Sequence, residues 1–313
     1  MRHILIHHGD WDGIVAAWVA KQALQGQKVA DEDIEVYGIQ YNQPFEVSIT
    51  GAVVYILDFS FPPEVFWPMF ETAKKVVMLD HHATALADWS KNHPENRTQK
   101  DAFKKYVSEG DISIWIKDGV AGCELTWRWF YENEPMPLLV EYAADHDLWK
   151  FEAQDSHLVR AIMRSYKQSL ESCDLLDAQM NGNWSDIEAE GAAIIRYQDG
   201  LVETACRHAE QFEIDGVLCL GAQVAFDGLI SLVAGKLAEE AVDKVKGNFG
   251  LCWFKAQGNK YVYSLRSREG GIDVSTIAKR MGGGGHAKAA GFSSEHPPTW
   301  FLAKAVEARR HDA

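Results

Sequence analysis

The feature that most constrains the fold is a short apolar run at residues 76–79, which stops abruptly at Asp80-His81-His82. The run leaves no room for the apolar stripe of a helix, so it predicts a buried β-strand. Active sites in parallel α/β sheets are built at the carboxyl ends of such strands. A surface loop with one aspartate and two solvated histidines is the simpler alternative. Two other strands that end in a similar way favour the active-site interpretation.

The first apolar run of the chain also ends in polar residues. Residues 3–7 have strand character and break into His8-x-Asp10-x-Asp12-Gly13, after which apolar residues recur near helical spacing. If the loop is extended, the two aspartates point to the same side and can share a cation. Asp-x-Asp-Gly is also ordinary turn chemistry, and Asp12 could simply cap the helix.

A third run, at residues 52–57, ends in Asp58 shortly before a pair of prolines opens another helical segment. A lone aspartate in this position is usually a helix cap. The case for Asp58 as a ligand therefore depends on the similar residues at the other two strand ends. With a further strand at 35–39, strands alternate with helices along the first half of the chain. This alternation predicts an α/β fold with a doubly wound, mostly parallel sheet.

The length of 313 residues is sufficient for two domains, each with its own core. We expect an N-terminal domain over residues 1–185, a long connecting helix over 186–212, and a smaller C-terminal α/β domain over 213–313. The polar stretch 91–118 interrupts the first domain, and it predicts a long loop or peripheral insertion with a short helix.

The charge and cysteine content limit the function classes. A net charge of −14 repels long nucleic acid, so a phosphate ligand must be attracted locally, for example by cations held among carboxylates. The five cysteines are widely spread and include no Cys-x-x-Cys, which is typical of reduced thiols rather than of disulfides or structural zinc. No apolar run reaches membrane-spanning length. We therefore expect a soluble, cytoplasmic protein that does not bind long duplex nucleic acid or membranes.

Near the C-terminus, four consecutive glycines at 282–285 precede His286. Glycine runs cost backbone entropy on folding, so their presence suggests close approach of the backbone to a ligand. Gly-rich backbone N–H groups, with Arg266 upstream and His286 downstream, would suit a phosphate. A flexible linker is the alternative, but the apolar segment 289–292 that follows argues for folded structure.

Carboxylates and imidazoles at the predicted strand and helix ends form a set of metal-ligand type. Its members are His8, Asp10, Asp12, Asp58, His81 and one of the pair Asp145 and Asp147. Such a set suits two Mn²⁺ or similar ions, whereas structural zinc would favour cysteine. Two ions that share a carboxylate such as Asp58 would support phosphoester hydrolysis by an activated water.

The order of these motifs closely resembles the DHH phosphoesterases that have a DHH-associated C-terminal domain. The resemblance rests on His8-x-Asp10-x-Asp12-Gly13, Asp58, Asp80-His81-His82, Asp145 and the glycine run with His286. It implies an N-terminal domain that holds two Mn²⁺ ions, with Mg²⁺ or Co²⁺ as substitutes, and a smaller domain that binds substrate across a cleft between the two.

Residue by residue, the resemblance implies three groups of site residues. The metal ligands are His8, Asp10, Asp12, Asp58, His81 and Asp145. The catalytic pair is His82, which contacts the scissile phosphate or assists the leaving group, and Asp80, which orients the neighbouring imidazole. The substrate-binding residues are Arg266, Ser267, Gly283, Gly284, Gly285 and His286. Sequence spacing alone does not decide between His7 and His8, or between Asp145 and Asp147.

Within this family we expect a phosphodiesterase that cleaves short RNA or DNA oligonucleotides, or related phosphorylated nucleotides, to mononucleotides. The acidic charge and the short C-terminal domain argue against a processive exonuclease on long DNA. A 3′-phosphoadenosine 5′-phosphate phosphatase and a cyclic-dinucleotide phosphodiesterase are the related alternatives. A nucleotide-binding protein without turnover is the alternative of a different class. A homodimer is compatible with the sequence.

Overall fold

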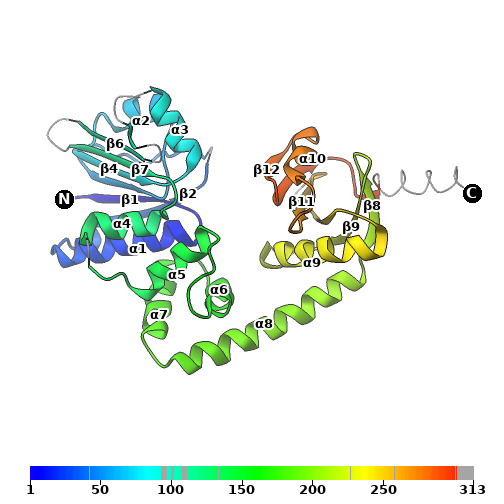
Figure 1. The fold of residues 1–313 in the computed structure, drawn as a ribbon. Coiled ribbons are helices and arrows are strands. Elements are labelled where there is room, and N and C mark those ends of the chain that lie inside the picture. Colours follow the sequence, from blue (N-terminus) through cyan, green and yellow to red (C-terminus); the bar gives the residue numbers. More distant parts are fainter. Residues whose placement is uncertain are drawn as a thin grey trace, which may run out of the picture. The chain divides into compact units, whose positions relative to one another are not determined.

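The computed structural model describes residues 1–41, 43–92, 97–99, 102–107, 111–132, 134–225, 227–256, 258–299 and 301. The chain folds into two compact units, residues 1–192 and 193–313. Each unit contains one β-sheet with helices packed on it (Figure 1). The division falls inside one helix, α8 (Trp184–Arg207). Within the described residues, no helix is both long and apolar enough to cross a membrane.

The sheet of the first unit has seven strands in the order β2-β1-β3-β4-β7-β6-β5. Its strands are β1 (His3–His8), β2 (Ile34–Ile39), β3 (Val53–Leu57), β4 (Lys75–Asp80), β5 (Arg97–Gln99), β6 (Ala102–Val107) and β7 (Ile112–Lys117). The first five strands of that order are parallel, and β6 and β5 continue the sheet in antiparallel fashion. The predicted α/β class with a mainly parallel sheet is confirmed.

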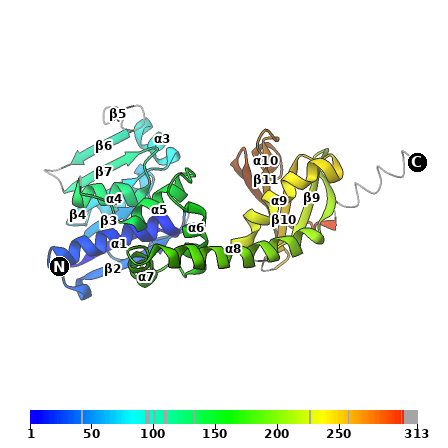
Figure 2. The same ribbon diagram turned by 60° about the horizontal axis from the view of Figure 1, so that its bottom comes forward.

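Helices cover both faces of this sheet. They are α1 (Trp11–Gly26), α2 (Pro63–Phe70), α3 (Ala83–Asn92), α4 (Gly122–Tyr131), α5 (Leu138–Asp147), α6 (Ser156–Ser165) and α7 (Leu170–Met180), with a short 3₁₀ turn at Asp31–Asp33. α1 and α4 lie side by side in both views (Figures 1 and 2), and α2 and α3 lie on the opposite face. The core under α2 and α3 is formed by alternate strand residues, such as Ile4, Ile56 and Met78, against Phe66 and Trp89.

The expectation of a long loop in residues 91–118 is wrong, because the described part of this stretch contains the strands β5, β6 and β7. In β7, Ile114 and Ile116 are fully buried, and the strand pairs in parallel with β4. The polar residues around this segment masked its short period-2 pattern. Lys100, which belongs to the same stretch, lies outside the described residues.

The second unit has a six-stranded sheet in the order β12-β13-β11-β10-β9-β8. Its elements are β8 (Glu210–Ile214), β9 (Val217–Gln223), α9 (Asp227–Val245), β10 (Phe249–Lys255), β11 (Tyr261–Ser267), α10 (Val274–Arg280), β12 (Gly284–His286) and β13 (Ala289–Ser294). One face packs on α9 and the end of α8, for example through Cys252, Leu237 and Val202. The other face packs on α10 through Ile277 and Ala278.

Candidate metal centre

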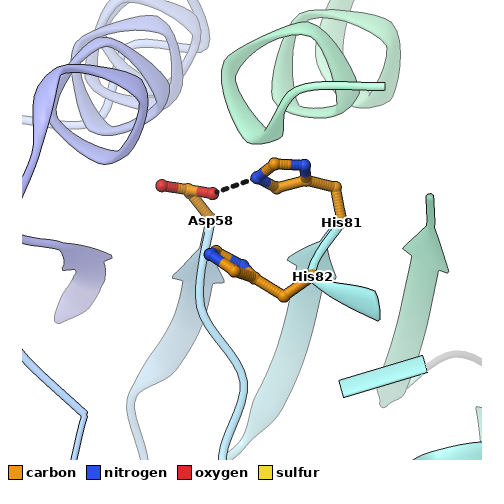
Figure 3. Close-up of side chains that lie close together, drawn as sticks. All are labelled: Asp58, His81 and His82. Carbon is orange, nitrogen blue, oxygen red and sulfur yellow. Dashed lines mark ion pairs between the residues drawn. The ribbon is translucent and has the colours of Figure 1, made fainter. Parts of the chain in front are cut away.

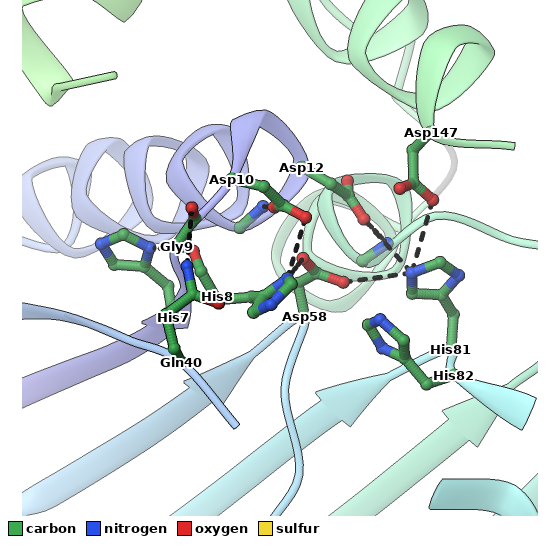
Figure 4. Close-up of polar contacts among 12 residues, drawn as sticks. His7, His8, Gly9, Asp10, Asp12, Gln40, Asp58, His81, His82 and Asp147 are labelled. Atoms are coloured by element: carbon green, nitrogen blue, oxygen red, sulfur yellow. Dashed lines mark hydrogen bonds and ion pairs between the residues drawn. The ribbon is translucent and has the colours of Figure 1, made fainter. Parts of the chain in front are cut away.

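The carboxyl ends of three adjacent strands, β1, β3 and β4, meet at one edge of the first sheet. Their side chains converge there with those from the start of α1 and the end of α5 (Figure 4). The cluster contains His8, Asp10, Asp12, Asp58, Asp80, His81, His82 and Asp147. Adjacent parallel strands place these residues together although they are far apart in sequence.

The turn from β1 to α1 fixes the first ligands. Asp10 caps α1 by accepting a hydrogen bond from the Gly13 N–H at 2.9 Å. A Cβ at Gly13 would lie 2.1 Å from the His8 carbonyl oxygen, so only glycine fits this tight turn. His8 Nδ1 lies 2.8 Å from the Asp10 carboxylate, and Asp10, together with Asp58, raises the pKa of His8 to about 10.

Strand alternation turns His7 away from the cluster. Its Nδ1 donates a hydrogen bond to the His8 carbonyl at 2.6 Å, and its ring faces Gly38 of β2. The His7 ring is buried, and this burial lowers its pKa. The geometry therefore brings His8 rather than His7 to the cluster.

Asp12 is held by the first turn of α4. Its carboxylate accepts hydrogen bonds from the backbone N–H groups of Gly122 at 2.6 Å and Cys123 at 2.8 Å. Free N–H groups at a helix N-terminus favour an anion in this position. Burial, followed by the nearby Asp58 and Asp147 charges, nevertheless raises the pKa of Asp12 well above its ordinary value.

Asp58 occupies the centre of the cluster and is fully buried. Its φ of +54° lies in the left-handed region, which aspartate tolerates better than most residues. One carboxylate oxygen lies 3.1 Å from His81 Nε2 (Figure 3), and the other lies 3.6 Å from His8 Nδ1. Burial raises the pKa of Asp58 to about 7. A carboxylate so placed can serve two ions at once.

The end of β4 supplies a supported histidine pair. Asp80 is fully buried and accepts hydrogen bonds from the His81 N–H at 2.7 Å and from His82 Nδ1 at 2.7 Å. The pKa of His82 is raised because the Asp80 hydrogen bond and charge together outweigh the opposing effect of burial. Asp80 thereby fixes the ring of His82 and leaves its Nε2 for another partner.

The end of α5 separates the two aspartates between which the sequence could not choose. Asp147 lies 3.4 Å from His81 Nε2, within the cluster. Asp145 instead directs its carboxylate to the following loop, where it accepts hydrogen bonds from the Glu152 N–H at 2.8 Å and from the Ser156 hydroxyl at 2.5 Å. The structure therefore does not bring Asp145 into the cluster with the other predicted ligands; Asp147 takes that position.

Three sets of side chains in the cluster have ligand atoms within 4.8 Å of one another. They are His8, Asp10 and Asp58; Asp58, His81 and His82; and Asp12, His81 and Asp147. Among the described residues, five buried atoms of these sets find no hydrogen bond of ordinary geometry: His8 Nδ1, both oxygens of Asp58, His81 Nε2 and Asp147 Oδ2. Buried polar atoms are normally satisfied, and divalent cations would satisfy this group. The residues present therefore fit a pair of metal ions.

In the second unit, Arg266 of β11 is anchored against α9. Its Nη2 donates a hydrogen bond to the Ser231 hydroxyl at 2.9 Å, and Nη1 donates to the Leu265 carbonyl at 2.9 Å. Its Nε is buried and has no hydrogen-bond partner among the described residues. The Ser267 N–H donates to the Lys288 carbonyl at 3.0 Å, which joins β11 to the segment before β13.

The glycine run is largely explained by contacts of the chain with itself. Gly282 follows α10 with a φ of +80°. A Cβ at Gly283 would lie 2.1 Å from the Gly291 carbonyl oxygen, and one at Gly285 would lie 2.6 Å from the Ala289 carbonyl oxygen. Close packing of β12 on β13 therefore requires these glycines. Gly284 has open space around its Cα, and His286 is exposed at the edge of the sheet.

Sequence reasoning missed two aromatic residues beside the cluster. The Tyr41 ring packs on Phe59 with a centroid distance of 4.6 Å, and it lies 5.6 Å from the His82 ring. Tyr41 follows the end of strand β2, as the other cluster residues follow or end their strands. This position in the sequence could have indicated that Tyr41 lies beside the cluster. The sequence gives no comparable indication of the role of the Gly122 and Cys123 N–H groups, because that role depends on the packing of α4 against α1.

Comparison with known proteins agrees with the fold and with the motif near the C-terminus. Residues 231–308 match the family model of the DHHA1 domain. The whole chain is similar in fold to a solved DHH domain of a protein that is described as a member of a family of ribosomal proteins. That match has 16% identity and a TM-score of 0.50, and it covers 97% of this chain and 86% of the other. The match places a DHHA1 domain within residues 231–308, and the fold of the whole chain is similar to that of a solved DHH domain.

Two further similarities extend over nearly the whole chain. It is similar to a structure of exonuclease RecJ bound to manganese, with 13% identity and a TM-score of 0.51 over 97% of this chain and 88% of that one. It is also 22% identical to the uncharacterized protein R106 of Acanthamoeba polyphaga mimivirus, over 93% of this chain and 67% of that protein. At these identities, the structural likeness shows a shared fold.

Proposed function

We propose that this protein is a phosphoesterase of the DHH family that hydrolyses short oligonucleotides, of about two to five nucleotides, to mononucleotides with the aid of two divalent ions. The observation that carries the proposal is the central Asp58, whose buried and unsatisfied carboxylate lies between two groups of ligands. One group consists of His8 and Asp10, and the other of Asp12, His81 and Asp147.

Mn²⁺ is the ion we propose, with Mg²⁺ or Co²⁺ as substitutes, because mixed carboxylate and imidazole ligands without cysteine suit ions of this type. Two such ions supply charge neutralisation at the phosphoryl oxygens and a bound water of lowered pKa. Asp147 replaces Asp145 in the proposed ligand set, because both oxygens of Asp145 already accept hydrogen bonds from the following loop.

The side chains around the proposed ions have separate tasks. His82, held through Nδ1 by Asp80, can donate a hydrogen bond from Nε2 to a phosphate oxygen or to the leaving oxygen when its ring is protonated. The Gly122 and Cys123 N–H groups keep Asp12 in place. Removal of Asp80 would release the His82 ring and slow turnover through its orientation rather than through metal binding.

For the second unit we propose that Arg266, Ser267, His286 and the backbone at Gly283, Gly284 and Gly285 bind a terminal phosphate of the substrate. The unsatisfied Nε of Arg266 and the open space around Gly284 support this role. The preference for short substrates is supported by the net charge of −14, which disfavours long polyanions away from the cations.

The test is hydrolysis of a substrate panel with Mn²⁺ and with EDTA. The panel contains labelled RNA from about two to twenty-four nucleotides, linear and cyclic dinucleotides, and 3′-phosphoadenosine 5′-phosphate. We expect the shortest linear oligonucleotides to be cleaved fastest, to mononucleotides, and EDTA to abolish the reaction. Faster cleavage of the monoester or of the cyclic dinucleotides would contradict the substrate class. Binding of metal and nucleotide without hydrolysis would contradict the proposal that the protein is an enzyme.

A further inference from the structure

The loop that follows α5 exposes two large aromatic side chains. Trp149 is 64% exposed and Phe151 is 37% exposed. Both have left-handed backbone conformations, with φ of +53° and +52°. Such conformations are unfavourable for bulky residues and persist only where the surroundings hold them. The two rings meet edge to face, with centroids 5.5 Å apart.

Asp145 holds this loop in place. Its carboxylate accepts hydrogen bonds from the Glu152 and Ala153 N–H groups, and its carbonyl accepts one from the Lys150 N–H at 3.0 Å. The Trp149 N–H donates to the His146 carbonyl at 3.3 Å. Exposed rings on a loop fixed in this way are presented to solvent in one orientation, which lowers the entropic cost of binding a flat ligand.

Two arginines of α6 accompany the rings. The Arg160 guanidinium carbon lies 5.2 Å from the centroid of the Trp149 ring and 4.8 Å from that of Phe151. Arg164 follows one helical turn later, and burial together with the Arg164 charge lowers the pKa of Arg160 to about 10. Within the part of the chain that the structure describes, no carboxylate forms an ion pair with either arginine, and burial is the main influence on both guanidinium groups. In a chain of net charge −14, this unpaired cationic pair favours an anionic ligand.

Resting on the function proposed above, we propose that Trp149, Phe151, Arg160 and Arg164 form a binding platform for the nucleotide that adjoins the scissile phosphate. A base stacks on the exposed Trp149 ring, and the arginines attract a phosphodiester group of the same strand. Exposed aromatic rings beside cations bind single-stranded nucleic acid in this way, with little sequence preference. Trp149 follows Asp147 by two residues, so their Cα atoms lie within about 7 Å, close enough for adjacent nucleotides to reach both.

The experiment measures binding and turnover of a dinucleotide that contains the fluorescent base 2-aminopurine, whose emission falls when it stacks. In EDTA, where turnover stops, we expect Trp149→Ala to raise the Kd by about fivefold or more and to reduce the quenching. Trp149→Phe should retain most of the binding, because it keeps a flat ring. Tyr197→Ala is the matched control, since Tyr197 is 69% exposed in the second unit and should leave the Kd unchanged.

The charge component is tested by the dependence of binding on salt. Arg164→Gln should reduce the slope of log Kd against log salt by about one, while Arg207→Gln, at another exposed helical arginine, should leave it unchanged. With Mn²⁺, Trp149→Ala should raise KM more than it lowers kcat. On a dinucleotide analogue without bases, the same substitution should have no effect.

Unchanged Kd and KM in Trp149→Ala, in an enzyme that cleaves the dinucleotide, would overturn the platform and leave the proposed function intact. An equal loss on the analogue without bases would also overturn it, because the effect would then be structural. Absence of Mn²⁺-dependent hydrolysis in the unmodified protein would instead count against the proposed function. If the unmodified protein shows no hydrolysis, loss of 2-aminopurine quenching in Trp149→Ala would still support a nucleotide platform.

Discussion

At the scale of single residues, Asp58 combines complete burial with a lack of hydrogen-bond partners of ordinary geometry among the described residues. It is a fully buried carboxylate in a left-handed backbone conformation, and neither of its oxygens makes a hydrogen bond of ordinary geometry with the described residues. Burying a carboxylate is unfavourable by several kcal/mol, and the His8 and His81 rings, 3.6 and 3.1 Å from its oxygens, offset part of that cost. We therefore expect that Asp58 lowers the stability of the metal-free protein and contributes to ligand binding.

We predict that Asp58→Asn abolishes metal-dependent hydrolysis and raises the melting temperature of the metal-free protein. The substitution keeps the shape of the side chain and removes a buried negative charge. Calorimetry in EDTA and with Mn²⁺ measures the stability effect, because the stabilisation by Mn²⁺ should be smaller in the variant than in the unmodified protein. A variant with full hydrolytic activity would contradict the role of Asp58 as a shared ligand.

A second prediction concerns Gly122, at the first turn of α4. A Cβ there would lie 2.4 Å from Asp58 Cβ, so Gly122→Ala should displace Asp58 or α4 and destabilise the protein by about 1–3 kcal/mol. Mn²⁺ affinity should fall as well, because Asp12 is bound to the same turn. Gly26→Ala is the control in the same unit, since its Cβ meets no described atom within 4 Å and should cost little. Chemical denaturation and Mn²⁺ titration measure the two effects.

At the scale of elements, the end of α5 divides two tasks between aspartates that are two residues apart. Asp147 points into the metal cluster, while Asp145 ties down the loop that carries Trp149 and Phe151. Residues with this spacing on a helix do not face the same direction, so the two carboxylates necessarily point to different neighbours. The last turn of α5 therefore connects the candidate metal centre to the proposed nucleotide platform.

This division predicts different defects for the two aspartates. Asp147→Asn should weaken Mn²⁺ binding by about tenfold or more and leave the fold intact. Asp145→Asn should keep Mn²⁺ affinity within about twofold and lower the unfolding free energy by about 1 kcal/mol, because it weakens the charge-assisted hydrogen bonds to the loop. Isothermal titration with Mn²⁺ and urea denaturation separate the two. The reverse pattern would show that Asp145 is the ligand.

At the scale of the whole molecule, the proposed metal ligands all belong to the first of the two compact units, residues 1–192. We predict that Mn²⁺ slows hydrogen exchange in peptides that contain the ends of β1, β3, β4 and α5, and leaves peptides of residues 193–313 unchanged. Bound ligand reduces local opening where it makes contacts. Mass spectrometry of the full chain, with Mn²⁺ and with EDTA, provides the comparison. Protection confined to residues 193–313 would contradict the location of the metal centre.

The sequence by itself determined the elements that carry the cluster and the types of its ligands. Short apolar runs that end in Asp and His predict strands with polar tips, and together they indicate Asp58, His81 and one of His7 and His8 as candidate ligands. This prediction of strands failed for β7, whose pattern is short and surrounded by polar residues. The sequence interpretation also attributed the glycine run to ligand binding. In the structure, contacts of Gly283 and Gly285 with β13 and the residues beside it require glycine at these positions.

Only the tertiary structure decided where each side chain points. The turn at Gly13 and the pairing of β1 with β2 direct His8 into the cluster and His7 towards Gly38. The loop after α5 satisfies Asp145 and leaves Asp147 to the cluster, and α4 brings two N–H groups to Asp12 from a distant part of the sequence. Sequence patterns report local periodicity, whereas these choices depend on contacts between segments that are distant along the chain.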